Sequence, residues 1–196
     1  RANAYLVDGL DNGDRVSSTT LNSFFSQQVV REYVLMKNSF APEFGRATGG
    51  VMNVVTERGE NDFAASAFVQ GSSRQFNSAG SFVEELPGAS ADDSGELSAF
   101  GFKLGGPITR DRSFYFLAFE QQASDDIYPY TGVDRNGVPG GVLRGTNRDS
   151  NIFLRGDFNL SDSDFLMARR AGDKRASEGL NVGGVTTPEA GFTLDE

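Results

Sequence analysis

The sequence predicts a mainly β protein in which antiparallel strands are joined by turns and longer loops. Apolar and polar side chains alternate over Leu97–Gly106 and Ser150–Leu160, the pattern of strands with two different faces. The chain has 24 glycines and 17 phenylalanines, which suits tight turns and aromatic sheet faces. It contains no run of about 18 apolar residues, so we expect no transmembrane helix.

Composition excludes several kinds of chemistry. The 196 residues contain no cysteine and no histidine, which removes disulfides, thiolate metal sites and Ser–His or Cys–His catalytic pairs. A net charge of −9 argues against non-specific nucleic-acid binding, which needs a basic surface. We therefore predict no enzyme activity, no metal, no cofactor and no nucleic-acid partner.

The first part of the chain predicts two short strands separated by polar connections. Asn3–Val7 is prone to form a strand and leads into the turn-rich, acidic segment Asp8–Asp14. A calcium loop is not expected there, because Leu10 occupies the third ligand position. Ser17–Gln28 predicts a short helix or loop capped by a serine or threonine, and Val29–Lys37 predicts a second strand.

The segment Phe44–Gly59 organises the sequence. Its first half carries Gly45, Gly49 and Gly50, which allow close approach of neighbouring backbone. Its second half, Val51–Thr56, is rich in β-branched residues and predicts a buried strand. The glycines do not form a phosphate-binding loop, because no Gly-Lys-Ser/Thr follows them.

The second part of the chain predicts a series of antiparallel strands. We expect five of them: Phe63–Gly71, Leu97–Gly106, Ser113–Gln122, Ser150–Leu160 and one beginning at Asp164–Ala171.

The predicted connections alternate in length. Long polar loops are expected over Ser72–Glu96, over Ser124–Asp149 and from Gly172 onward, with short turns at Pro107–Arg112 and Ser161–Ser163. This alternation is typical of outer-membrane barrels. On strand periodicity alone, a soluble β-sandwich or meander is the better interpretation, because soluble sheets outnumber barrels.

If the strands line a barrel, charge decides which face meets lipid. Charged and polar residues would then face the lumen: Lys103, Asn151, Arg155 and Asp157. Apolar residues on the opposite face would contact lipid: Phe100, Phe102, Leu104, Ile152, Leu154 and Phe158.

Two long motifs carry a resemblance to a known family. The first is Asn38-Ser-Phe-Ala-Pro-Glu-Phe-Gly-Arg-Ala-Thr-Gly-Gly-Val-Met-Asn-Val-Val-Thr-Glu-Arg-Gly-Glu-Asn-Asp-Phe63, preceded by Tyr5-Leu-Val-Asp-Gly9. The second is Gly105-Gly-Pro-Ile-Thr-Arg-Asp-Arg-Ser-Phe-Tyr-Phe116. Together they resemble the Oar-like branch of TonB-dependent outer-membrane receptors over roughly residues 3 to 120. Alanines at positions 64 and 65 replace the His-Gly usual in that branch.

The resemblance implies a domain division and a function. Residues 1–60 would be the C-terminal part of an α+β plug domain, and residues 61–196 the first four to five strands of an incomplete barrel with long extracellular loops. The protein would lie in the bacterial outer membrane, contact its lipid, and import a nutrient or peptide-like ligand when TonB displaces the plug. The TonB-contacting segment would precede this region.

The resemblance also suggests how the plug is held. Plug groups near Arg46 would contact the barrel wall, pairing with a lumen-facing carboxylate such as Asp157, with Glu43 and Glu32 nearby in sequence. The alternative is a solvated turn residue. Gly45, Gly49 and Gly50 would be structural glycines of the plug.

Aromatic residues in the predicted loops are candidates for ligand contact. They are Phe76, Phe82, Tyr128 and Tyr130, which would stack on a ligand or, as we favour, stiffen the loops. Two other functions stay open from the sequence. One is a binding or adhesion barrel without import, and the other is a soluble β-rich ligand-binding domain.

Overall fold

A computed structural model describes residues 3–12, 26–37, 49–73, 95–180 and 192–195. The chain divides into two compact units. Unit 1 comprises residues 1–66, 102–119 and 151–173, and unit 2 comprises residues 67–101, 120–150 and 174–196. Within the described residues there is no α-helix, and no helix is long and apolar enough to cross a membrane.

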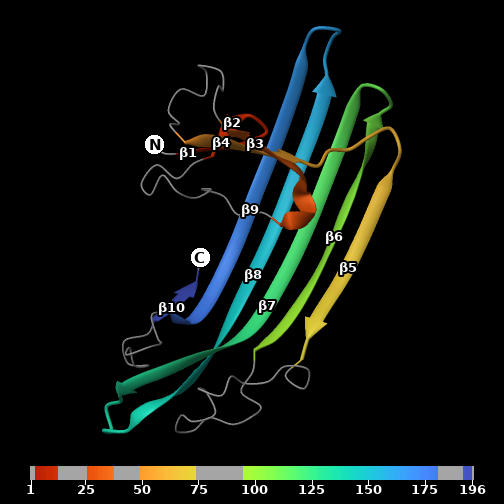
Figure 1. Ribbon diagram of the computed structural model, residues 1–196. Helices are drawn as coiled ribbons and strands as arrows, with labels where there is room; N and C mark the ends of the chain where they lie inside the picture. The colour runs from red at the N-terminus through yellow and green to blue at the C-terminus, as the bar shows by residue number, and fades with distance from the viewer. Residues whose placement is uncertain (1–2, 13–25, 38–48, 74–94, 181–191, 196) are drawn as a thin grey trace. The chain divides into compact units, whose positions relative to one another are not determined.

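The small sheet, as we call it, has four strands in the order β2-β1-β4-β3 (Figure 1). Its strands are β1 (Asn3–Val7), β2 (Leu10–Asp11), β3 (Val30–Lys37) and β4 (Gly50–Thr56). The central pair, β1 and β4, is parallel, while β2 and β3 are antiparallel to their neighbours. Val51 and Val54 are fully buried on β4, as their β-branched run predicts.

Two local features shape this sheet. Asp8 and Gly9 have φ of 49° and 80° and form the tight turn between β1 and β2. Positive φ at both positions matches the twist of a two-residue hairpin, and Asp and Gly tolerate it. The predicted capped segment ends in a 3-10 turn, η1 (Gln27–Val29), where the Ser26 hydroxyl accepts from the Gln28 N–H at 3.0 Å.

The large sheet has six strands in the order β10-β9-β8-β7-β6-β5, with long strands side by side (Figure 1). The strands are β5 (Ala64–Ser72), β6 (Glu96–Thr109), β7 (Ser113–Val133), β8 (Pro139–Asn159), β9 (Phe165–Leu180) and β10 (Phe192–Asp195). All five predicted strands are present, and β10 was not predicted. Most of the predicted loop over Ser72–Glu96 lies outside the described residues.

One predicted loop is wrong, and two other predicted connections begin later than expected. Ser124–Asp149 is not a long loop, because β7 and β8 continue through it and meet at a turn over residues 134–138. The chain after Gly172 stays in β9 as far as Leu180. Pro107 lies within β6, so the first short turn covers only residues 110–112. In each case sheet pairing overrides the turn preference of proline and glycine.

Glycines inside β8 make room for aromatic side chains in unit 2. A Cβ at Gly141 would lie 2.5 Å from the Tyr130 hydroxyl oxygen, and one at Gly145 would lie 2.9 Å from Tyr128 Cε2. Both glycines therefore allow strand to continue where the sequence alone suggests a turn.

The two faces of the large sheet differ as predicted. Phe102 and Leu154 are exposed by 39%, and Phe100 and Ile152 by 48% and 46%. On the other face Phe153 and Asp157 are each only 2% exposed. The face predicted to be apolar is thus the exposed one, and the polar face is covered.

Candidate functional site

Within unit 1, a buried group of charges joins the small sheet to strands β8 and β9 of the large sheet. We call this group the lock; it consists of Asp8, Thr56, Arg155, Asp157 and Arg169. Its side chains come from the β1–β2 turn, the end of β4, β8 and β9. Their sequence separations reach 161 residues, so the lock forms only when the fold is complete.

Asp8 is the centre of the lock. The β1–β4 pairing sets this turn beside the end of β4, where the Asp8 carboxylate accepts from the Thr56 N–H at 2.8 Å and from its hydroxyl at 2.9 Å. The same carboxylate is 3.4 Å from Arg155 Nη1 and 3.0 Å from Arg169 Nη1. The Asp8 side chain is only 8% exposed, so these partners replace water around its charge.

Arg155 extends the lock to a second carboxylate on its own strand. Its Nε lies 2.9 Å from Asp157 Oδ2, and its Nη2 donates to Asp157 Oδ1 at 2.9 Å. Its Nη1 donates to the Thr56 hydroxyl at 2.7 Å and to the Thr56 carbonyl at 3.1 Å. The alternation of β8 directs Arg155 and Asp157 to one face, where the guanidinium bridges two acids.

The charges of the lock balance. Two carboxylates, Asp8 and Asp157, meet two guanidinium groups, Arg155 and Arg169, so the group is neutral overall. Arg155 is 9% exposed and Arg169 is 20% exposed. Burial of a balanced, hydrogen-bonded group is tolerable, whereas removal of one partner leaves an uncompensated charge.

An apolar contact accompanies the lock. Val29, in η1, is fully buried in a cluster with Phe116, Ala118 and Phe153 from β7 and β8. The Phe116 and Phe153 rings meet edge to face with centroids 6.2 Å apart. We call this cluster the Val29 socket; burial of one such side chain stabilises by about 1.5 to 3 kcal/mol.

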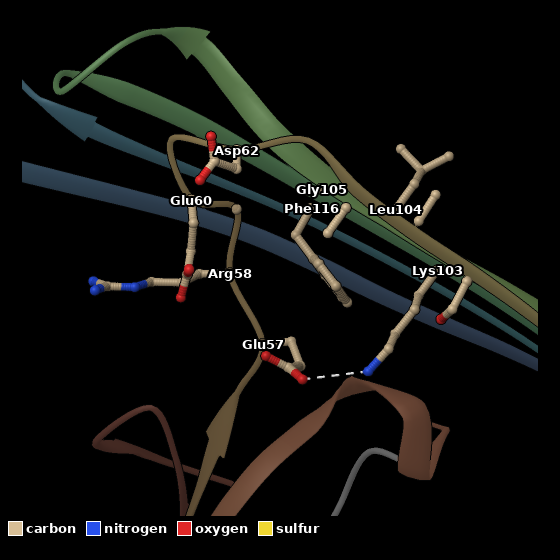
Figure 2. A pocket seen from close by; sticks show the side chains of 12 residues that line it. Glu57, Arg58, Glu60, Asp62, Lys103, Leu104, Gly105 and Phe116 are labelled. Carbon is tan, nitrogen blue, oxygen red and sulfur yellow. Dashed lines mark hydrogen bonds and ion pairs between the residues drawn. The ribbon is translucent and has the colours of Figure 1, made fainter.

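A weaker ion pair lies beside a cavity of about 310 Å³. Figure 2 shows Lys103 of β6 reaching Glu57, with Nζ 3.3 Å from Glu57 Oε1, and Phe116 and Gly105 lining the same cavity. Lys103 Nζ also donates to the Gln28 carbonyl at 3.4 Å. Both charged side chains are 30% exposed, so this pair contributes less than the lock.

The residues predicted to hold a plug against a barrel wall are only partly within the described residues. Arg46, Glu43 and Gly45 lie outside the described residues. Glu32 is exposed on β3, and Asp157 is paired with Arg155. Gly50 begins β4, where a Cβ would lie 3.2 Å from the Met36 carbonyl oxygen, while Gly49 directly precedes the strand.

Of the four residues predicted to contact a ligand, two lie within the described residues. Phe76 and Phe82 lie outside the described residues. Tyr128 and Tyr130 lie on β7 rather than in a loop. The Tyr128 hydroxyl accepts from Asn147 Nδ2 at 3.1 Å, and Tyr130 is 9% exposed beside Gly141.

Sequence reasoning missed Asp8, Thr56 and Arg169. The sequence places Asp8 in a turn-rich acidic segment, directly after a β-prone run. That position could have suggested a fixed carboxylate, but nothing in the sequence pairs it with β8 or β9. Among the residues the structure describes, no group of acids suggests a metal site.

Comparison with known proteins gives a consistent result. No protein-family model matches the chain. The TonB-dependent transporter Oar of Myxococcus xanthus is 32% identical over 124 residues, which cover 60% of this chain and 11% of that protein. The chain therefore spans about a tenth of the length of this curated relative.

Solved structures show the same fold. Two mutants of the ferric enterobactin receptor PfeA from Pseudomonas aeruginosa, both in complex with enterobactin, align with a TM-score of 0.57 and 18% identity. Each alignment covers 90% of this chain and 26% of the receptor chain. These comparisons confirm the predicted resemblance and the predicted fold class.

Proposed function

We propose that this chain, which matches the TonB-dependent receptors in sequence and in fold, contributes the end of a plug and the first wall strands of an outer-membrane importer. Residues 1–60 would then belong to the plug and residues 61–196 to the wall. The small sheet corresponds to the plug part and the large sheet to the wall. The relatives are named as a transporter and a receptor, and this is the class we assign.

The lock is the observation that carries the proposal. It attaches the small sheet to the polar face of strands β8 and β9 by buried charges, beside the apolar contact of the Val29 socket. An importer needs a plug attachment whose geometry is specific at rest. During transport, the hydrogen bonds of that attachment must be replaceable by hydrogen bonds to water. Buried polar contacts meet both needs, because their net stabilisation is small although their geometry is strict.

The outward face of the large sheet supports a place in the membrane. Phe100, Phe102, Ile152 and Leu154 are exposed on it, whereas a soluble sandwich would bury them in its core. Strands β6 to β9 have 14, 21, 21 and 16 residues, more than the roughly 9 to 11 that cross a bilayer. We propose that lipid covers the apolar part and that the remaining part projects beyond it.

The partners follow from the proposed class. TonB would act through a segment outside this sequence, outer-membrane lipid would contact the exposed apolar face, and an external nutrient or peptide-like ligand would be carried. Tyr128, whose hydroxyl is held by Asn147, remains a candidate for ligand contact. The burial of Tyr130 favours a packing role for it.

Fractionation of cells that express the complete protein tests the proposal. We expect it in the outer membrane, resistant to alkaline extraction, with a gel mobility that changes on boiling. A protein that is soluble without detergent and insensitive to heat would contradict the membrane assignment. An outer-membrane barrel that retains its ligand at the surface, and imports none when TonB is present, would favour adhesion over import.

A further inference from the structure

The linker, by which we mean residues 57–63 between β4 and β5, has its own attachment to the large sheet. We infer that the linker is fixed to the wall independently of the plug, so that the part of the plug free to move ends at Arg58. The contacts that attach the linker all lie within unit 1. Its mechanistic meaning rests on the proposed function.

Gly59 allows the linker backbone to approach β6 and β7 closely. A Cβ at this position would lie 2.2 Å from the Tyr115 carbonyl oxygen and 2.8 Å from the Gly106 carbonyl oxygen. Both contacts are with backbone, which cannot turn aside as a flexible side chain can. The linker therefore lies at a distance from the wall that only glycine permits.

Asn61 and Asp111 form a reciprocal clamp two residues further along. Asn61 Nδ2 donates to Asp111 Oδ1 at 2.6 Å, and the Asp111 N–H donates to Asn61 Oδ1 at 2.8 Å. Asp111 has φ of 61° in the turn between β6 and β7. Asn159 of β8 continues the contact, with its Nδ2 donating to the Asp111 carbonyl at 3.4 Å.

The clamp and the lock have no residue in common. Along this part of the chain, the last residue of the lock is Thr56, and the linker's own contacts with β6 and β7 begin at Gly59. Between them lie Glu57, held by the half-exposed pair with Lys103, and Arg58, which is exposed and points away from Lys103 in Figure 2. The Glu57 N–H also donates to the Val29 carbonyl at 2.7 Å, so the exposed Arg58 is the first residue beyond the small sheet's contacts, and we place the hinge at residues 57 and 58.

Trypsin reports directly on the clamp, because it cleaves after Arg58 and the following residue, Gly59, is buried. Cleavage requires the linker to leave the wall. In the complete protein, Asn61→Asp sets a second carboxylate beside Asp111, and we expect cleavage after Arg58 to be about five- to tenfold faster. Hydrogen exchange of the β4 amides should not change. Glu60→Gln, at an exposed neighbour, is the matched control and should leave cleavage unchanged.

The reverse experiment loosens the lock. Asp8→Asn should raise hydrogen exchange on β4 and leave cleavage after Arg58 unchanged. If Asp8→Asn accelerates cleavage as well, the two attachments act together and the inference is wrong. It is also wrong if Asn61→Asp leaves cleavage unchanged. Both measurements are independent of transport, so failure of the proposed function would appear separately, in the fractionation.

Discussion

Asp8→Asn is the most direct test of the lock, because it preserves shape and removes one charge. Asparagine can still accept from the Thr56 N–H, but it loses the charge that faces Arg155 and Arg169. Arg155 keeps its pair with Asp157, whereas Arg169 loses the charge of its partner Asp8. The lock changes from neutral to a net charge of +1 in a group that is largely buried.

The magnitude follows from these contacts. Removing one partner of a buried ion pair costs about 3 to 5 kcal/mol. The retained Thr56 contact and the 20% exposure of Arg169 place the expected loss near the lower end, about 3 kcal/mol. At about 1.4 kcal/mol per factor of ten, the population in which the small sheet is detached should increase by roughly two orders of magnitude.

Hydrogen exchange of the β4 amides in the detergent-solubilised complete protein measures this opening. Glu32→Gln, which removes the same charge from an exposed position on β3, should leave exchange unaltered. The double variant Asp8→Asn with Arg155→Gln should lose less than the sum of the single variants, since the two residues interact directly. Unchanged exchange in Asp8→Asn, or strict additivity, would refute the argument that Asp8 holds the sheet.

Three further predictions concern packing and the membrane face. Val29→Ala should lower the stability of the small-sheet contact by about 1 to 3 kcal/mol, measured by thermal unfolding, because it empties the Val29 socket. Phe102→Arg should reduce the heat-modifiable band in the outer membrane, because an arginine facing lipid costs about 2 to 4 kcal/mol at mid-depth. Ser98→Arg, on the same face but at the third residue of β6, replaces a residue that is already polar and should have a smaller effect. Gly145→Ala should lower the stability of the protein by about 1 to 3 kcal/mol in the same unfolding assay, because the added Cβ would lie 2.5 Å from a carbonyl oxygen of β9. Gly71→Ala is the control and should be neutral, because its Cβ would lie 3.9 Å from the nearest atom.

The strand faces could be predicted from sequence because they depend on a local period of two. The alternation of Phe100 and Phe102 with Lys103 is visible without knowledge of any partner strand. The length of β7 and β8 could not be predicted in this way. Pro139 and Gly141 are turn residues by composition, but here proline is the first residue of β8 and glycine accommodates Tyr130.

The lock could not be derived from the sequence for a different reason. Arg155 and Asp157 were placed correctly on the polar face, because that follows from strand alternation. The second carboxylate that contacts Arg155 is Asp8, which lies 147 residues away in sequence, and its role depends on how two sheets meet. Local pattern identifies which side chains face inward, while long-range geometry decides which of them pair.

The parallel pairing of β1 with β4 has a mechanical consequence. The five residue pairs from Asn3–Gly50 to Val7–Val54 run in the same direction. A force applied to the chain ahead of β1, resisted by the linker that follows β4, pulls the two strands from opposite ends. Such a load acts along the strands and stresses all of their cross-strand hydrogen bonds together, instead of opening them one after another. The β1–β4 pair therefore resists such a load along its whole length.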